Sequence, residues 1–237
     1  MTRALILAGG AGPRRTELDA AWPGWSEGIG LVIGADAGAL LAGPLGLSLD
    51  LIVGDGDSLG PAALSAFEAS GIAVERAPTD KDASDLELAL AAARLRGAAE
   101  LIVLGAFGAR VDHFLANVWL LAWPGLADAD VVMLDGRTRV RLLTGPAPGP
   151  GPSGRLTRRL GLTERPGDLV TLLPFGGPAD GVTTQGLRWP LAGSTLPLGS
   201  SLGLSNEVLG GAAGRPWVAL EQGRLLIIET SLLGSST

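Results

Sequence analysis

The chain has 237 residues, of which 46% are hydrophobic and 18% are charged, so it is long and apolar enough for one large or two small globular domains. Its net charge of −6 argues against a nucleic-acid or membrane-binding face, although it leaves room for one nucleotide bound through a metal ion. The lack of cysteine excludes disulfides, thiolate nucleophiles and thiolate metal sites. The apolar run at residues 4–9 is too short to span a membrane and lacks a signal-peptide layout, so we expect a cytoplasmic protein.

The first 135 residues alternate between segments that predict strands and segments that predict helices. Strands are expected at residues 4–9, 30–36, 50–55, 72–77, 100–105 and 130–135. Helices are expected at residues 37–43, 61–70, 84–97 and 111–123. Gly43 and Pro44 are expected to stop the first helix, and Ser84 with Glu87 predicts a capping box at the start of the third. This alternation indicates a mainly parallel sheet covered on both faces.

After Asp135 the helical periodicity disappears, and glycine and proline separate short apolar segments. Strands are expected at residues 139–144, 168–175, 181–189, 216–222 and 223–230. The predicted fold is therefore α/β, with a mainly parallel sheet in a domain of residues 1–135 and an antiparallel β-sandwich or barrel-like domain in residues 136–237.

Two short stretches concentrate acidic side chains, GDGDS at residues 54–58 and TDKDASD at residues 79–85. Crowded carboxylates repel one another unless a cation lies between them. Asp36 and Asp55 end predicted strands, Asp57 comes directly after the second of these, and Asp82 and Asp85 lie in the loop after the next predicted strand. Because the carboxyl ends of parallel strands share one edge of a sheet, these side chains should converge on a Mg²⁺ site.

Positive charge lies at the same predicted edge. Lys81 is the only lysine of the chain and stands among the aspartates, and Arg110 ends the glycine-rich segment GAFGAR at residues 105–110. Glycines, a helix N-terminus and a forked guanidinium suit phosphate oxygens. Taken singly, each residue also has an ordinary structural explanation: Asp82 as a helix-start residue, Asp112 as a partner of the helix dipole, His113 as an exposed histidine. The functional interpretation rests on their meeting at one edge.

Six motifs in this order resemble thiamine pyrophosphokinases, over most of the chain. They are GADAGA (34–39), GDGDS (54–58), DKDASDLELAL (80–90), GAFGARVDHFLAN (105–117), TTQGLRWPL (183–191) and GLSNE (203–207). The resemblance implies an N-terminal ATP-binding catalytic domain, a C-terminal thiamine-binding β-sandwich, and a homodimer with sites between subunits. It implies transfer of diphosphate from ATP to the hydroxyl of thiamine, giving thiamine diphosphate and AMP.

The resemblance also assigns roles to single residues. Asp55, Asp57, Asp82 and Asp85 are expected to serve catalysis, Mg²⁺ and the triphosphate. The residues expected to line the ATP pocket are Asp36, Lys81, Arg110, Asp112 and His113. Ser205 and Asn206 are expected to contact the aminopyrimidine of thiamine. Some family members stack thiamine on an aromatic side chain of the last strand, where this chain is aliphatic; Trp189 and Trp217 are the alternatives, and core positions are the stronger expectation for both.

Two other interpretations stay open from the sequence. The segment LAGGAGPRR at residues 7–15 is similar to the opening loop of sugar-nucleotide nucleotidyltransferases, and an Asp-x-Asp pair fits their metal. That reaction would not explain the loop at residues 79–85, the GAFGARVDH segment or the small β domain. A sensor that binds nucleotide or thiamine without turnover is the second alternative, and the retained acidic positions argue against it.

Overall fold

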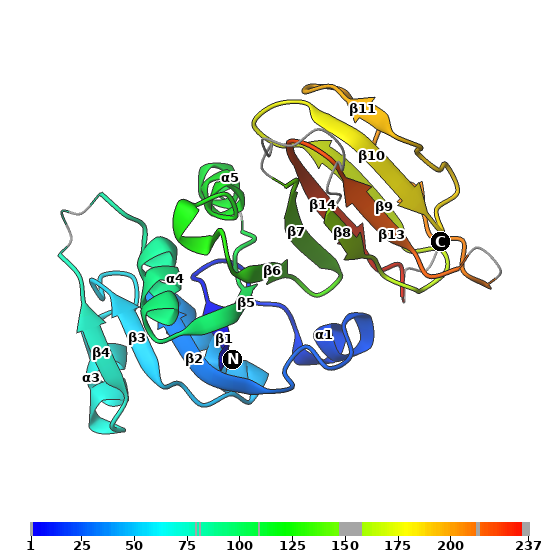
Figure 1. Cartoon of the computed structure of the whole chain (residues 1–237). Coiled ribbons are helices and arrows are strands. Elements are labelled where there is room, and N and C mark those ends of the chain that lie inside the picture. Colours follow the sequence, from blue (N-terminus) through cyan, green and yellow to red (C-terminus); the bar gives the residue numbers. More distant parts are fainter. Residues whose placement is uncertain are drawn as a thin grey trace. The chain divides into compact units, whose positions relative to one another are not determined.

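The computed structural model describes residues 2–78, 80, 82–108, 110–146, 158–211 and 214–233 (Figure 1). Lys81 lies outside the described residues. The chain divides into two compact units, Met1–Gly136 and Arg137–Thr237, whereas the sequence interpretation places the domain boundary after Asp135. None of the described helices is both long and apolar enough to cross a membrane.

The first unit alternates strands and helices. Its strands are β1 (Thr2–Leu7), β2 (Ile29–Ala35), β3 (Leu51–Gly54), β4 (Ala73–Arg76), β5 (Ala98–Leu104) and β6 (Asp130–Leu134). Its helices are α1 (Arg15–Ala21), η1 (Asp36–Leu41), α2 (Ala42–Leu45), α3 (Pro61–Ala69), α4 (Asp85–Leu95), α5 (Val111–Leu120) and η2 (Pro124–Leu126), where η marks a 3₁₀ helix.

The strands of this unit form a parallel sheet in the order β6-β5-β1-β2-β3-β4. From β1 the chain proceeds outward through β2 and β3 to β4, and then returns to the other side of β1 with β5. The order reverses between β1 and β5, and ligands of open parallel sheets bind outside the carboxyl ends of the strands at such a point.

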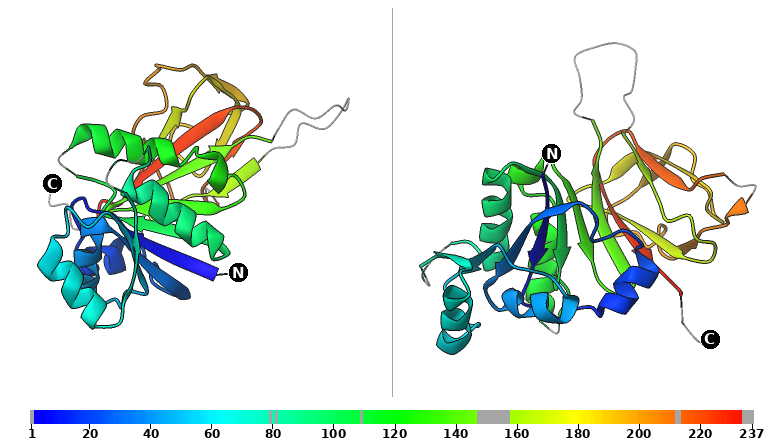
Figure 2. Two further views of the ribbon diagram at one scale, coloured as in Figure 1. Left: turned by 90° about the vertical axis from the view of Figure 1, so that its left-hand side faces the viewer. Right: turned by 90° about the horizontal axis from the view of Figure 1, so that it is seen from below.

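Successive side chains of each strand point to opposite faces of this sheet, and helices pack against the sheet. On one face, Leu5 and Leu7 of β1 belong to a buried cluster with Leu18 of α1 and Leu45 of α2. Helix α4 packs against β1, β2, β3 and β5. Figure 2 shows helices on both sides of the sheet. The loops at the strand ends are therefore carried by a rigid, close-packed layer.

The segment after β2 differs from its prediction. Gly43 and Pro44 were expected to stop a helix, but both lie inside α2, which ends at Gly46 in the left-handed conformation (φ 64°). Proline is tolerated in the first turn of a helix because its missing N–H has no intrahelical partner there. Helix α1 was not predicted, because its seven residues are too few for a clear periodicity.

The second unit is built from strands alone in the described residues. They are β7 (Thr138–Thr144), β8 (Arg158–Gly161), β9 (Leu169–Pro174), β10 (Ala179–Gln185), β11 (Ser194–Leu196), β12 (Asn206–Glu207), β13 (Trp217–Leu220) and β14 (Arg224–Thr230). One antiparallel layer has the order β12-β9-β14-β7 and the other β11-β10-β13-β8. The expected strand at residues 181–189 ends earlier, because Gly186 turns the chain (φ 75°).

Both layers of this unit contribute to one apolar core. Val170 and Ile227 come from the first layer, and Val182 and Val218 from the second; all four are completely buried. Two antiparallel layers enclosing a common core form a sandwich. The predicted fold class, a mainly parallel α/β domain followed by an antiparallel β-sandwich, is confirmed.

A buried ion-pair network crosses the first layer of the sandwich. Glu229 of β14 is 0% exposed, and its carboxylate accepts hydrogen bonds from Arg139 at 2.6 and 2.7 Å and from Arg141 at 2.7 Å. The backbone N–H of Thr163 donates to the same carboxylate at 2.6 Å. Burial raises the pKa of Glu229, but the hydrogen bond from Arg139 and the charges of Arg141 and Arg139 outweigh it, so the pKa lies below its usual value.

We predict that Glu229→Ala lowers the free energy of unfolding by about 3–5 kcal/mol, because it leaves two arginines without their shared carboxylate. Denaturant unfolding measures this change. Glu68→Gln, which removes a surface partner of Arg76, should cost less than about 1 kcal/mol. Because the folded-state pKa of Glu229 is depressed, its stabilisation is complete above the unfolded pKa and declines as pH falls through the folded one. Equal costs for both variants at neutral pH would contradict the assignment.

Candidate functional site

Asp36 occupies a special backbone position at the carboxyl end of β2. It is 3% exposed and adopts a left-handed conformation with φ 45°, which non-glycine residues adopt uncommonly. Its carboxylate accepts hydrogen bonds from the N–H groups of Ser58 at 3.1 Å and Leu59 at 3.3 Å. The turn after β3 therefore holds the Asp36 carboxylate in place.

Three carboxylates meet at this edge. Oxygen atoms of Asp36, Asp55 and Asp85 lie within 4.8 Å of one another. Gly54 permits this approach, because a Cβ atom there would lie 2.9 Å from Cβ of Asp36 and 3.2 Å from Oδ1 of Asp85. We refer to Asp36, Asp55 and Asp85 as the carboxylate cluster.

The carboxylate cluster suits a small divalent cation. Mg²⁺ prefers hard oxygen ligands at 2.0–2.1 Å, so two ligands on opposite sides of one ion are about 4 Å apart. The oxygen atoms of the carboxylate cluster all lie within 4.8 Å of one another, so a small shift of the side chains would bring them to one ion. One side chain comes from the end of β2, one follows β3, and one opens α4, so the sheet and the helix fix their relative positions.

Asp57 and Asp82 are exposed and do not belong to this group in the described part of the chain. The N–H of Asp57 donates to Oδ1 of Asp55 at 3.0 Å, which closes a tight turn after β3. Ser84 caps α4 by accepting a hydrogen bond from the N–H of Glu87 at 3.2 Å, as the capping-box spacing predicts. This cap places Asp85 at the first position of the helix.

The segment after β5 carries three of the residues that were expected to line the ATP pocket. Arg110, Asp112 and His113 are all exposed around the start of α5. The guanidinium of Arg110 pairs with the carboxylate of Asp112 at 2.6 Å. The hydrogen bond from Arg110 and the backbone N–H of His113 lower the pKa of Asp112 to about 2. Asp112 is therefore an anion at neutral pH, held beside the cation that was expected to meet phosphate.

The loops after β1 and β5 are joined at the point where the strand order reverses. The N–H of Gly10 donates to the carbonyl of Gly105 at 2.9 Å, and the N–H of Ala11 donates to that of Phe107 at 2.8 Å. A Cβ atom on Gly10 would lie 2.4 Å from the Gly105 carbonyl oxygen, so this contact requires glycine. The two loops therefore form one backbone unit.

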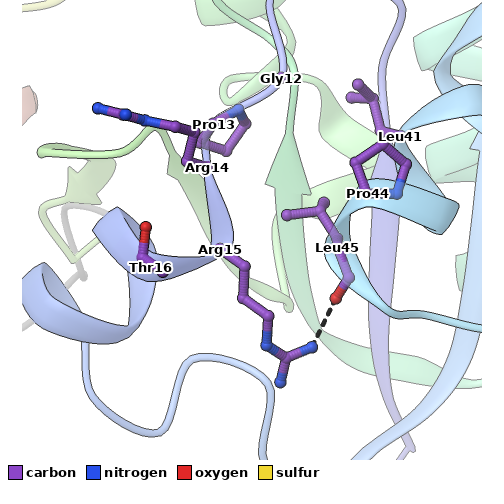
Figure 3. Close-up of a pocket in the computed structure, with 8 residues that line it drawn as sticks. All are labelled: Gly12, Pro13, Arg14, Arg15, Thr16, Leu41, Pro44 and Leu45. Carbon is purple, nitrogen blue, oxygen red and sulfur yellow. Dashed lines mark hydrogen bonds between the residues drawn. The ribbon is translucent and has the colours of Figure 1, made fainter.

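Beside these loops lies a pocket of about 430 Å³ (Figure 3). One wall is the segment of residues 12–16 that leads into α1, and the other contains Leu41, Pro44 and Leu45. Arg15 reaches across, and its guanidinium donates to the carbonyl of Leu45 at 2.5 Å. The thiamine pyrophosphokinase resemblance did not point to this pocket. Its sequence signal was the segment LAGGAGPRR, which was assigned to the nucleotidyltransferase alternative.

In the second unit, the amide of Asn206 binds backbone. Its oxygen accepts from the N–H of Trp189 at 3.1 Å, and its NH₂ donates to the Trp189 carbonyl at 2.7 Å. Ser205 next to it is exposed and adopts a left-handed conformation with φ 53°. Asn206 therefore fixes the backbone that presents Trp189.

The expectation that both tryptophans lie in the core is wrong for Trp189, whose side chain is 58% exposed. The guanidinium of Arg188 lies 5.4 Å from the centre of its ring. Trp217 has two partners in its own unit. The guanidinium carbon of Arg159 lies 3.9 Å from the centre of its ring, and its indole N–H donates to Gln185 at 2.8 Å. Trp189 thus offers an accessible aromatic face next to Ser205 and Asn206.

Comparison with known proteins matches both units. Residues 25–133 match the family model "Thiamin pyrophosphokinase, catalytic domain", and residues 158–215 match "Thiamin pyrophosphokinase, vitamin B1 binding domain". Thiamine pyrophosphokinase of Bacillus subtilis (strain 168) is 26% identical over 186 residues, which cover 78% of this chain and 82% of the relative. Thiamine pyrophosphokinase 1 of Oryza sativa subsp. japonica is 28% identical over 165 residues, covering 67% of this chain and 59% of the relative.

Solved structures show the same fold. The thiamine pyrophosphokinase structure from Bacillus subtilis superposes with a TM-score of 0.77 at 24% identity, covering 98% of this chain and 99% of that one. The structure from Candida albicans gives a TM-score of 0.75 at 15% identity, covering 97% and 89%. With its catalytic and vitamin-binding parts matched in order, the chain belongs to the thiamine pyrophosphokinase family, a family of enzymes that form thiamine diphosphate.

Proposed function

We propose that the protein transfers the terminal diphosphate of ATP to the hydroxyl group of thiamine with the help of Mg²⁺. The thiamine oxygen forms a bond to the β-phosphorus, the bond between this phosphorus and the oxygen bridging to the α-phosphate breaks, and AMP leaves with that oxygen. The hydroxyl proton passes to solvent or to a carboxylate. The carboxylate cluster is the observation that carries this proposal, since phosphoryl transfer depends mainly on positioning and charge neutralisation.

In this proposal the carboxylate cluster would hold Mg²⁺, which would supply charge neutralisation for the diphosphate. Asp57 and Asp82, which are exposed, would complete the ligand set of the metal. The guanidinium of Arg110 leaves the carboxylate of Asp112 and binds phosphate oxygens. His113 follows in the same segment, and Lys81 supplies further positive charge. The resemblance assigned Asp36 to the ATP pocket. Because it lies with Asp55 and Asp85, we propose a metal ligand role for it instead.

Unit 2 would then bind thiamine. The exposed indole of Trp189 provides a face for a flat, positively charged ring, because aromatic faces attract cations. Ser205 offers a hydroxyl beside it, and Asn206 acts by holding the Trp189 backbone as well as by any contact of its remaining N–H.

The proposed reaction predicts AMP as the nucleotide product when the protein is incubated with ATP, Mg²⁺ and thiamine. Asp85→Asn should lower kcat at least tenfold and weaken Mg²⁺ binding measured by calorimetry, because it removes one negative charge from the carboxylate cluster. Glu87→Gln is the matched control, since Glu87 lies in the same first turn of α4 and outside the cluster. Formation of ADP, or release of diphosphate only with a sugar phosphate, would contradict the reaction. Nucleotide binding without any product would support a sensor instead.

The thiamine site predicts a split between the two substrates. Trp189→Ala and Asn206→Ala should each raise the KM for thiamine about tenfold and change the KM for ATP less than twofold. A tenfold effect corresponds to about 1.4 kcal/mol, within the range of an aromatic–cation contact. Trp217→Phe should leave both constants unchanged. Equal increases for both substrates in steady-state kinetics would argue against this placement of thiamine.

We further propose a homodimer, as the family resemblance implies, with the active site at the subunit interface. Val111, Leu115 and Trp119 recur every four residues on one side of α5 and are 66, 48 and 62% exposed, which is unusual for apolar side chains on one helix face. If this stripe contacts a second copy, Trp119→Glu should shift the wild-type dimer toward monomer in light scattering coupled to gel filtration. Leu95→Glu, at an 88% exposed leucine of α4, should not. A wild-type monomer, or dimers for both variants, would refute the assignment.

A further inference from the structure

The segment of residues 203–206, which opens the last of the six sequence motifs, is held against strand β9. The N–H of Leu172 donates to the carbonyl of Gly203 at 2.8 Å, and the residue after Ser205 pairs with β9 in the antiparallel ladder. Between these two contacts, the hydroxyl oxygen of Thr171 accepts a hydrogen bond from the N–H of Ser205 at 3.0 Å. The first two contacts join backbone to backbone, whereas the third depends on the threonine side chain.

The backbone of Ser205 adopts an unfavourable conformation. Its φ is 53°, and in the part of the chain that the structure describes, Asp36 and Ser205 are the two residues other than glycine with a positive φ. Such backbones persist only where the surrounding structure holds them. Asp36 is held through its carboxylate, which accepts from two N–H groups. Ser205 is held through its own N–H, which the hydroxyl of Thr171 accepts.

The fold of β9 fixes the direction of the Thr171 side chain. Its neighbours Val170 and Leu172 are buried, and both belong to the core of unit 2. Because successive side chains of a strand point to opposite faces, Thr171 points away from that core. It pairs with Ile228 of β14 in the ladder, and the branched Cβ of threonine allows few rotamers. The hydroxyl is therefore a fixed acceptor on a half-exposed side chain.

The hydrogen bond from Ser205 decides where the serine hydroxyl points. The side chain of Ser205 is exposed and follows a backbone that, in the left-handed conformation, sets the direction of its Cβ. Rotation of that backbone into an ordinary conformation would turn the hydroxyl elsewhere. A hydroxyl both donates and accepts hydrogen bonds, as the amino group and ring nitrogens of an aminopyrimidine require. Its direction therefore matters to a ligand and not to the core.

We propose that Thr171 is a positioning residue for thiamine, an inference that rests on the proposed function. Its hydroxyl holds the N–H of Ser205, keeps Ser205 in the left-handed conformation and so directs the serine hydroxyl to the aminopyrimidine of thiamine. Thr171 acts through Ser205 and does not itself touch the ligand. The two exposed groups of the thiamine site thus each have a support: Asn206 holds the backbone of Trp189, and Thr171 holds that of Ser205.

The test measures the Kd of thiamine by calorimetry and the hydrogen exchange of the Ser205 amide by NMR. Thr171→Val keeps the branched shape but removes the acceptor, so it should weaken thiamine binding about fivefold and speed the exchange about tenfold. Thr171→Ser keeps the hydroxyl and should restore both to within about twofold of wild type. Thr195→Val is the matched control: it removes a hydroxyl that donates to Asp180 at 2.7 Å, in the other layer of unit 2, and should change neither.

A double-mutant cycle tests whether Thr171 acts through Ser205. Ser205→Ala removes the hydroxyl that is positioned, so in its background Thr171→Val should weaken thiamine binding by less than about twofold more. The Kd of ATP, measured with Mg²⁺, should stay unchanged in every variant. A general loss of structure would instead lower the affinity for both ligands in parallel.

Any of four results would overturn the proposal: wild-type thiamine affinity in Thr171→Val, parallel loss of thiamine and ATP, a full effect of Thr171→Val in the Ser205→Ala background, or no thiamine binding by the wild-type protein. The outcome is separate from that of the reaction. If thiamine binds and the variants behave as expected but no AMP forms, the role of Thr171 stands and the reaction fails. If AMP forms and Thr171→Val binds thiamine normally, the reaction stands and the role of Thr171 fails.

Discussion

Mutual repulsion of Asp36, Asp55 and Asp85 is the constraint on which the site depends. Their oxygen atoms lie within 4.8 Å of one another, and at that upper limit an effective dielectric constant near 20 gives a repulsion of about 3–4 kcal/mol between two unit charges. The fold opposes this repulsion with local structure: the N–H groups of Ser58 and Leu59 hold Asp36, and the Ser84 cap fixes the start of α4. A divalent cation between the three carboxylates would attract all of them and so offset their mutual repulsion. Without a cation, the backbone hydrogen bonds alone oppose that repulsion.

The two units use polar side chains differently. In the first, the carboxylates of Asp36, Asp55 and Asp85 come together at one edge of the sheet. In the second, the buried polar groups mainly organise the chain: Glu229 gathers two arginines, and Asn206 binds the backbone of Trp189. A residue that belongs to a family motif can therefore act through the neighbour that it positions, and its motif alone does not tell which.

The alternation of apolar strands and helices was sufficient to predict the parallel sheet and the sandwich, because burial imposes a period on the sequence. It also placed Asp36, Asp55 and Asp85 at one edge. It did not distinguish Asp55, which belongs to the carboxylate cluster, from Asp57, which does not, because both stand in the same short turn after β3. The exposure of Trp189 was missed because tryptophan is usually buried, and only the tertiary structure determines whether a particular tryptophan is exposed. The pocket was missed because its walls come from segments 25 or more residues apart, and the helices η1 and α2 that carry its aliphatic side chains are too short for a clear periodic signal.

Gly54 has no functional group, yet the geometry of the carboxylate cluster depends on it. Its missing side chain is the space in which Asp36 and Asp85 come together. A single added methyl would press on Cβ of Asp36 and on a carboxylate oxygen of Asp85 and so push the two side chains apart. A substitution of Gly54 could therefore abolish activity while every acidic side chain of the site is retained.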